Sequence, residues 1–242
     1  MIFTISARKK PRDMGVLEYL SVYFPGIPLA RIDSVFGFVE RSTLYGGRPF
    51  LGPELNDDDV DQLNANKIGL RIPFTNNYVT HEEYEQNQEM LTKYHKKGNA
   101  VIATSDDLAT WIRSDFPKYR IEASVIKNLD THDKIQTALE LYDTVVLPMA
   151  INNDHEFLKK VKNKKRITLF GNAGCALTCP SKICYPSISK VNKYQGGEMM
   201  CSRDIKDRNR MGMIDFDLKE LAALGFSRFK LLRSKPDGKT GY

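Results

Sequence analysis

From residue 67 onwards, short apolar runs alternate with longer amphipathic segments, and this alternation constrains the fold more than any other feature of the chain. The runs read KIGLRIPF, NAVIAT, YRIEAS, DTVVLP and RITLFG. Such runs are typical of buried strands, and the segments between them have the apolar spacing of helices. Strands that are joined by helices run parallel, so the sequence predicts βαβ units and a parallel sheet.

Three more β-rich runs bring the number of expected strands to eight. They are IFTIS at the start, SVFGFVE near residue 37 and SRFKLL near the end. Eight strands suit a closed (β/α) barrel, complete or irregular, which we expect as a single α/β domain over residues 1–242. An open sheet of seven or eight strands is the alternative. In both folds ligands bind at the carboxyl ends of the strands.

Two helix starts carry capping signals. Thr80 precedes Glu83 by three residues, which is the spacing of a capping box, and Asp217 with Glu220 repeats it. Gly225 is expected to end the last helix.

Composition bounds the partners and the compartment. The net charge of +6 suits an anionic partner such as RNA. The densest basic run, residues 159–166, is either the solvated end of a helix or a nucleic-acid contact. No stretch of eighteen apolar residues occurs, and the first residues do not resemble a secretory signal, so we expect a cytoplasmic protein without a membrane span.

All four cysteines of the chain lie close together in the sequence. Three, four and sixteen residues separate them, and none lies among the first 174 residues. In a reducing compartment this grouping favours a metal site over disulfides. Their segment, residues 172–210, follows the run RITLFG and contains the glycines and prolines that let one loop wrap a metal. The expected ligands are Cys175, Cys179, Cys184 and Cys201.

Two occupants are compatible with four thiolates, an iron–sulfur cluster and a zinc ion. Structural zinc usually takes paired Cys-x-x-Cys knuckles, and this chain contains none. The spacing therefore favours iron–sulfur, as [4Fe–4S], with zinc as the alternative. Buried or reactive thiols without a metal are the remaining interpretation.

Several segments resemble peptidase family U32, named for collagenase-like proteases. They are LYGGRPF at 44–50, YRIEASVIKN at 119–128 and residues 213–235, which resemble the family's helix, glycine and closing strand. Cys184 and Cys201 match two cluster cysteines of the family in spacing. The resemblance implies an iron–sulfur protein that hydroxylates bases of tRNA or ribosomal RNA using prephenate, or that acts in oxygen-independent ubiquinone synthesis.

The chain departs from this family pattern in two places. The family has six residues between its first paired cysteines, whereas four separate Cys179 from Cys184, and no cysteine follows Cys201. Cys175 would then supply the fourth ligand. Where the family has Glu-Gly-Arg, this chain has residues 232–234, reading LRS, so the carboxylate is missing.

Two charged residues on predicted strands are candidates for substrate contact. Arg71, in GLRIP, is able to hold the carboxylate of an acidic small-molecule cosubstrate by a bidentate pair. A structural ion pair inside the barrel is its alternative role. Glu122, in RIEAS, alternates with apolar neighbours and is expected to point into the barrel, where we consider it as a catalytic carboxylate. Ser124 and Asn172 also stand at strand ends.

Two other groups of residues have two interpretations each, and the histidines have one. The triplet at residues 57–59 is a solvated turn or a divalent-cation site. Four tyrosines are stacking surfaces for an extruded base or plain packing: Tyr45, Tyr78, Tyr185 and Tyr194. Four histidines lack ligand spacing and are expected at the surface of helices: His81, His95, His132 and His155.

The sequence thus favours an iron–sulfur enzyme, an oxygen-independent hydroxylase or redox enzyme acting on an RNA base or a small aromatic molecule. A non-catalytic binding module stapled by zinc or iron–sulfur is the main alternative, and a peptidase is the third. Substrate, electron donor and oligomeric state stay open.

Overall fold

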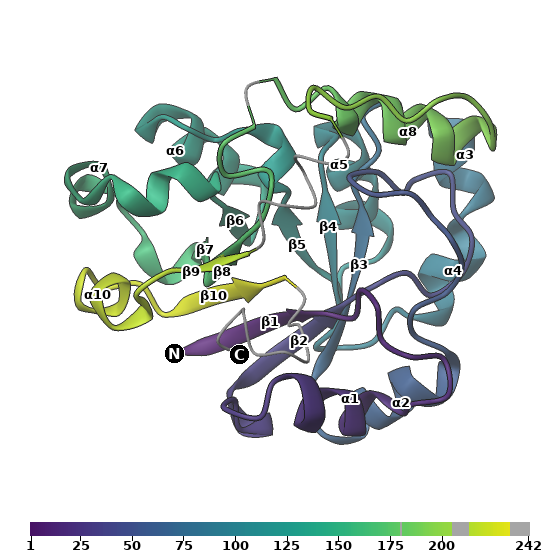
Figure 1. Ribbon diagram of the computed structural model, residues 1–242. Coiled ribbons are helices and arrows are strands. Elements are labelled where there is room, and N and C mark those ends of the chain that lie inside the picture. Colours follow the sequence, from purple (N-terminus) through teal and green to yellow (C-terminus); the bar gives the residue numbers. More distant parts are fainter. Residues whose placement is uncertain (180, 205–212, 233–242) are drawn as a thin grey trace.

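Eight parallel strands close into a barrel in the computed structural model, which describes residues 1–179, 181–204 and 213–232 (Figure 1). Around the barrel the order is β1-β10-β7-β6-β5-β4-β3-β2. The strands are β1 (Ile2–Ser6), β2 (Ile32–Phe36), β3 (Gly69–Phe74), β4 (Ala100–Ala103), β5 (Arg120–Ala123), β6 (Thr144–Val146), β7 (Ile167–Phe170) and β10 (Arg228–Leu231). Each overlaps a predicted run, although β2 starts two residues before SVFGFVE and ends at Phe36. Pairing of β1 with β10 closes the sheet and rules out the open alternative.

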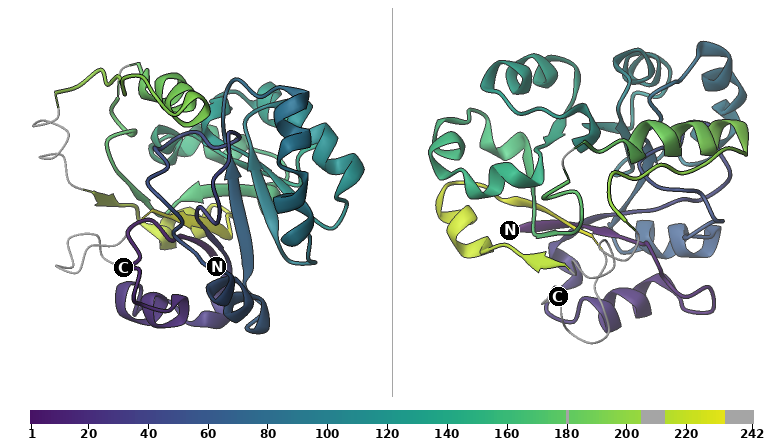
Figure 2. Two further views of the ribbon diagram at one scale, coloured as in Figure 1. Left: turned by 90° about the vertical axis from the view of Figure 1, so that its right-hand side faces the viewer. Right: turned by 45° about the horizontal axis from the view of Figure 1, so that its top comes forward.

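Helices surround the barrel, and one further helix lies over its end (Figure 2). The surrounding helices are α1 (Val16–Tyr23), α2 (Asp57–Ala65), α3 (His81–Gln86), α4 (Gln88–Lys93), α5 (Asp106–Asp115), α6 (His132–Leu141), α7 (His155–Lys160) and α10 (Leu218–Ala223). The helix over the barrel is α8 (Cys184–Tyr194). A two-stranded antiparallel sheet, β8 (Asn172–Ala173) with β9 (Ile214–Asp215), extends beyond β7. No helix in the described ranges is long and apolar enough to cross a membrane.

The predicted helix caps are present. Thr80 and Glu83 form a complete capping box at the start of α3. Asp217 accepts hydrogen bonds from the backbone N–H groups of Lys219 and Glu220 at the start of α10. Gly225 follows this helix with a φ of +96°, a conformation that glycine adopts without a steric penalty.

The aspartate triplet begins a helix and is not a solvated turn, so that interpretation was wrong, whereas the cation-site interpretation stays a prediction. Residues 57–59 form the first turn of α2, where carboxylates stabilise the positive end of the helix dipole. Asp59 is buried. It accepts a hydrogen bond from the backbone N–H of Val16 at 2.9 Å and pairs with Lys10 at 3.1 Å. The triplet therefore joins α2 to the start of α1.

The basic run includes two residues that hold helix ends. Lys164 donates to the carbonyl of Leu224, directly after α10, at 2.8 Å. Arg166 donates to the carbonyls of Leu139 and Tyr142 at the end of α6. These contacts match the helix-end interpretation, since cations stabilise the negative ends of helices.

Polar and charged side chains fill the middle of the barrel, where branched aliphatic residues are usual. In β5, Ile121 and Ala123 belong to the main apolar core while Glu122 between them faces inwards. Lys230 alternates in the same way between Phe229 and Leu231 in β10. The period of two along β5 and β10 thus separates an apolar outer face from a charged interior.

Candidate metal and substrate site

The cysteine segment starts where β7 ends and runs over the carboxyl ends of the strands. Asn172 and Ala173 pair with β9, after which the chain turns across the barrel to α8. The loops after β2 and β3 both contact α8 through hydrogen bonds. The segment therefore lies at the mouth where βα loops gather, the end at which TIM barrels place their active sites.

Hydrogen bonds join the parts of the segment that carry three of the cysteines. The Sγ of Cys179 lies 3.3 Å from the Oγ of Ser202 and accepts the backbone N–H of Lys182 at 3.3 Å. In α8, the Oγ of Ser187 accepts the N–H of Met200 at 3.1 Å and also contacts its carbonyl. The neighbourhoods of Cys179, Cys184 and Cys201 are thereby tied to one another.

Cys184 lies within electrostatic reach of the other three thiols. Burial raises the pKa of Cys184, and negative charge on Cys179, Cys175 and Cys201 raises it further. Burial also raises the pKa of Cys179, but hydrogen bonds from Ser202 and from backbone N–H groups outweigh it and leave that pKa below its ordinary value. Cys179 is thus the thiol that these hydrogen bonds favour as a thiolate.

The donor set suits a thiolate-bound metal in its chemistry, although the thiols are not drawn together. Within residues 1–179, 181–204 and 213–232, no group of three or more His, Cys, Asp or Glu side chains is placed to hold a metal ion. Cys175 is exposed and the other three are half-buried. Ligation by all four would require their segments to close on one another, so this ligand set stays a prediction.

A cavity of about 500 Å³ adjoins Cys179 at the mouth. That volume is in the range of small-molecule sites. Its walls come from the loops after β3 and β5 and from the cysteine segment, and they include Asn77, Tyr78, Ile126, Asn128, Lys182 and Tyr185. Lys182 is the one charged residue among the described lining residues. The cavity combines aromatic faces, amide groups and one cation.

The predicted tyrosines divide between the core and the mouth. Tyr45 is fully buried and stacks on Phe74 with ring centroids 5.9 Å apart, so its role as a base-stacking surface was wrong. Tyr78 and Tyr185 line the cavity. Tyr194 is 68% exposed at the end of α8.

Arg71 and Glu122 form an ion pair inside the barrel. This is the structural role that was the alternative to substrate contact for Arg71. Arg71 also donates to Ser34 at 2.9 Å and pairs with Asp33 at 2.9 Å. Lys230, which the sequence reasoning missed, lies 3.2 Å from Glu122. Two cations that alternate with apolar residues in RFKL were the signal that could have revealed it. Substrate contact by Arg71 or Glu122 stays a prediction, and the geometry supports an ion-pair role.

The two other strand-end residues have structural contacts. The Oγ of Ser124 accepts the N–H of Ile126 in the turn after β5. The Oδ1 of Asn172 accepts the N–H of Leu232 at 2.8 Å, and its buried Nδ2 has no hydrogen-bond partner in the part of the chain that the structure describes. Leu232 is the first residue of the triplet LRS, which stands where the U32 family has Glu-Gly-Arg. Residues 233 and 234 lie outside the described residues.

The histidines lie at the ends of helices, as expected. His81, His132 and His155 are the first residues of α3, α6 and α7. His95 follows α4, and its Nε2 accepts the backbone N–H of Lys118 at 2.8 Å.

A closed barrel of eight parallel strands with a cysteine segment over its mouth places the chain in the TIM-barrel class. The structure is similar to that of the U32 peptidase Mk0906, with a TM-score of 0.63 and 12% sequence identity over 97% of this chain and 93% of that one. A glycerophosphodiester phosphodiesterase from Agrobacterium tumefaciens also matches, with a TM-score of 0.46 and 11% identity over 100% of both chains. No family model and no curated protein matches the sequence. The likeness to Mk0906 is one of fold, and it agrees with the family resemblance of the sequence motifs.

Proposed function

We propose that the protein is an iron–sulfur enzyme with the fold of the U32 peptidases, an oxygen-independent hydroxylase or other redox enzyme acting on an RNA base or a small aromatic molecule. The observation that carries this proposal is the gathering of the thiols at the mouth of the barrel, where Ser187 and Ser202 tie together the segments of Cys179, Cys184 and Cys201 and Cys175 lies within electrostatic reach of Cys184. The mouth is the end at which barrels of this class carry out chemistry.

The four cysteines would hold the cluster, which would supply electron transfer next to the substrate. The N–H of Lys182 already points at the Sγ of Cys179, and such hydrogen bonds stabilise a thiolate and tune its redox behaviour. In the adjoining cavity, Tyr78 and Tyr185 offer ring faces, and Asn77 and Asn128 offer amide groups that can orient a planar ligand. Lys182 would attract an acidic cosubstrate.

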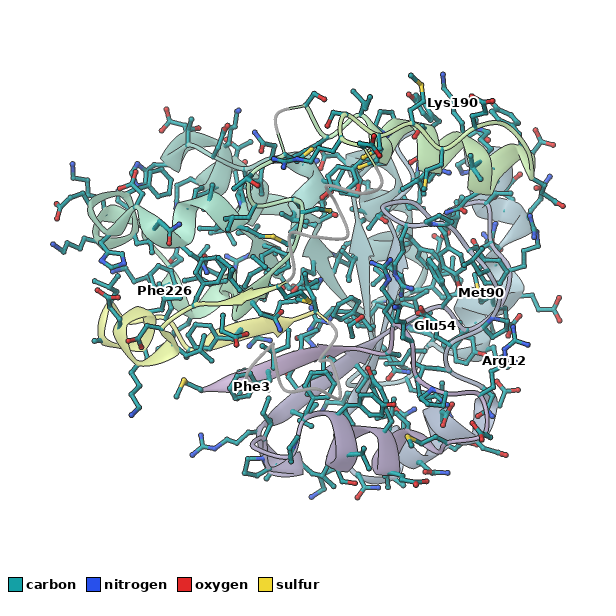
Figure 3. All side chains as sticks on the ribbon, viewed as in Figure 1. Phe3, Arg12, Glu54, Met90, Lys190 and Phe226 are labelled. Carbon is teal, nitrogen blue, oxygen red and sulfur yellow. The ribbon has the colours of Figure 1, made fainter. Side chains whose placement is uncertain are left out.

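The outer side of α8 supports RNA as a partner. The Nζ of Lys190 lies 5.5 Å from the ring centroid of Tyr78, and the ring of Tyr194 is 68% exposed at the end of the same helix. Lys190 stands at the edge of the molecule and points outwards (Figure 3). An exposed lysine beside aromatic rings suits single-stranded nucleic acid, because bases stack on rings while phosphates pair with cations.

Metal analysis of anaerobically purified protein tests the cluster. We expect a brown protein that contains iron and acid-labile sulfide, and a loss of both in each Cys→Ala variant. Ser181→Ala, in the same segment, is the matched control and should retain its iron. A colourless protein that binds one zinc ion would overturn the enzyme proposal and support the metal-stapled binding module. Full iron content in Cys175→Ala would show that the ligand set is wrong.

Mass spectrometry of RNA nucleosides, from cells with and without the gene, tests the substrate. Loss of one hydroxylated base would support RNA, whereas an unchanged profile would move the proposal to a small aromatic substrate. The peptidase alternative rests on the name of the structural neighbour, and hydrolysis of a gelatin or casein substrate by the metal-free protein would favour it.

A further inference from the structure

Helix α8 is fastened to the barrel largely by buried polar side chains. Ile188, Ser189 and Asn192 are its buried residues, so only one of the three is apolar. An eleven-residue helix with so little apolar contact needs another source of attachment. Ser189 and Asn192 provide it, on two different loops.

Asn192 binds the loop after β2. Its Oδ1 accepts the backbone N–H of Phe50 at 2.9 Å, and its Nδ2 donates to the carbonyls of Tyr45 and Arg48 at 3.2 and 3.0 Å. Its amide therefore satisfies three backbone groups of a segment more than 140 residues away in the sequence. With 6% of its surface exposed, its bonds are shielded from water.

Ser189 binds the loop after β3. Its carbonyl accepts the Nδ2 of Asn76 at 3.0 Å, and its Oγ accepts the N–H of Asn77 at 3.2 Å. Asn76 donates as well to the carbonyl of Thr43, at 2.7 Å, in the loop after β2. The two loops and α8 thus form one hydrogen-bonded unit.

This attachment reaches the cysteines through the helix itself. Cys184 is the first residue of α8, and Ser187, one turn later, holds the backbone of Met200 beside Cys201. Because an α-helix is a stiff rod over two or three turns, its anchored end determines where its first residue lies. We infer that Ser189 and Asn192 are positioning residues of the cysteine site, which hold Cys184 and the neighbourhood of Cys201 in place over the mouth.

The anchoring is tested on the metal-free, reduced protein, by measuring the alkylation rate of each cysteine with mass spectrometry. Asn192→Ala should raise the rate of Cys184 about tenfold, because loss of the buried amide bonds makes local opening of α8 easier. Cys175 is already exposed and should not change. Ser189→Ala is the milder variant, which keeps the test valid if Asn192→Ala does not fold.

Two controls separate positioning from a general loss of stability. Lys190→Ala changes the exposed face of the same helix and should leave the rate of Cys184 unchanged. Asn99→Ala removes a buried amide at the opposite end of the barrel, where Asn99 accepts the N–H of Leu70 and donates to Tyr94. It should lower the melting temperature without a specific rise at Cys184. Two results would overturn the inference. One is an unchanged alkylation rate of Cys184 in folded Asn192→Ala and Ser189→Ala, and the other is an equal rise of that rate in Asn99→Ala.

The link to the metal rests on the proposed function and has its own measurement. If the wild-type protein binds iron, Asn192→Ala should lose it to a chelator faster than Asn99→Ala at equal fractions of folded protein. Equal rates of iron loss would remove the link to the metal. A wild-type protein without iron would refute the proposed function. The positioning role would then be tested by the alkylation rates alone.

Discussion

Inside the barrel, the Nη1 of Arg71 lies 2.5 Å from the Oε2 of Glu122, and each side chain is only 1% exposed. Burial raises the pKa of Glu122, but the positive charges of Arg71 and Lys230 outweigh this effect and hold the pKa below its ordinary value. Glu122 is therefore ionised and shared between two cations. Removing one member of such a pair strongly destabilises the fold, because a charge is left buried without that partner.

Glu122→Gln should lower the free energy of unfolding by about 3–5 kcal/mol, the range for breaking a buried pair. Lys230 would then keep its charge in the barrel without a carboxylate, and Arg71 would retain only Asp33 as an anionic partner. Urea denaturation followed by circular dichroism measures the change. Glu89→Gln, at an exposed position on α4, is the control and should stay close to wild type. A loss below about 1 kcal/mol would show that the pair contributes little.

The free energy of unfolding should fall in acid as Asp33 becomes protonated. Burial raises the pKa of this carboxyl, but the charges of Arg71, Arg120 and Arg228 outweigh it and lower the pKa from 3.8 to about 2. Because the folded pKa is depressed, the stabilisation is complete above the unfolded pKa and is lost as pH falls from about 4 towards 2. It amounts to about 2 kcal/mol. Urea denaturation at several pH values should show a shallower acid dependence in Asp33→Asn, and an identical slope in both proteins would contradict this assignment.

The aspartate triplet offers a matched comparison within one helix turn. Asp59 is buried, pairs with Lys10 and accepts from Val16, whereas Asp58 is exposed. Asp59→Ala should cost about 3 kcal/mol, because it leaves the buried Lys10 without its anionic partner and the N–H groups of Val16 and Asn56 without their acceptor. Asp58→Ala should change stability by about 0.5 kcal/mol or less. Thermal or urea unfolding measures both, and equal effects would indicate that the triplet acts only through its charge.

Gly46 lies where two βα loops touch. A Cβ at this position would be 2.2 Å from the carbonyl oxygen of Thr75, which is backbone and has no rotamer to change. Gly46→Ala should therefore destabilise the protein by about 1–3 kcal/mol and weaken the contacts of these two loops with α8. Gly26→Ala is the control, because its Cβ would meet nothing within 4 Å. Melting temperatures distinguish the two, and a neutral Gly46→Ala would mean that the loops separate at little cost.

The sequence predicted every strand of the barrel, and the reason is local. Alternation such as Ile121, Glu122, Ala123 reports which face of a strand is apolar, and this pattern needs no knowledge of the partner strands. The order of strands and helices then placed the cysteine segment at the carboxyl end of β7. Capping residues such as Thr80 also act within a few residues of themselves, so their roles could be read directly.

Contacts between distant segments were decided by tertiary structure alone. Closure of the barrel depends on the pairing of β1 with β10, from opposite ends of the chain. Asp59 looked like part of a solvated turn until Lys10 and Val16 were folded against it. Nothing in the local sequence indicates that Asn192 satisfies the backbone of Phe50. The local sequence pattern shows which way a side chain faces. Its partner depends on which loops the closed barrel brings together. For Asn192 that partner is the loop after β2, and we infer that this contact holds the cysteine site in place.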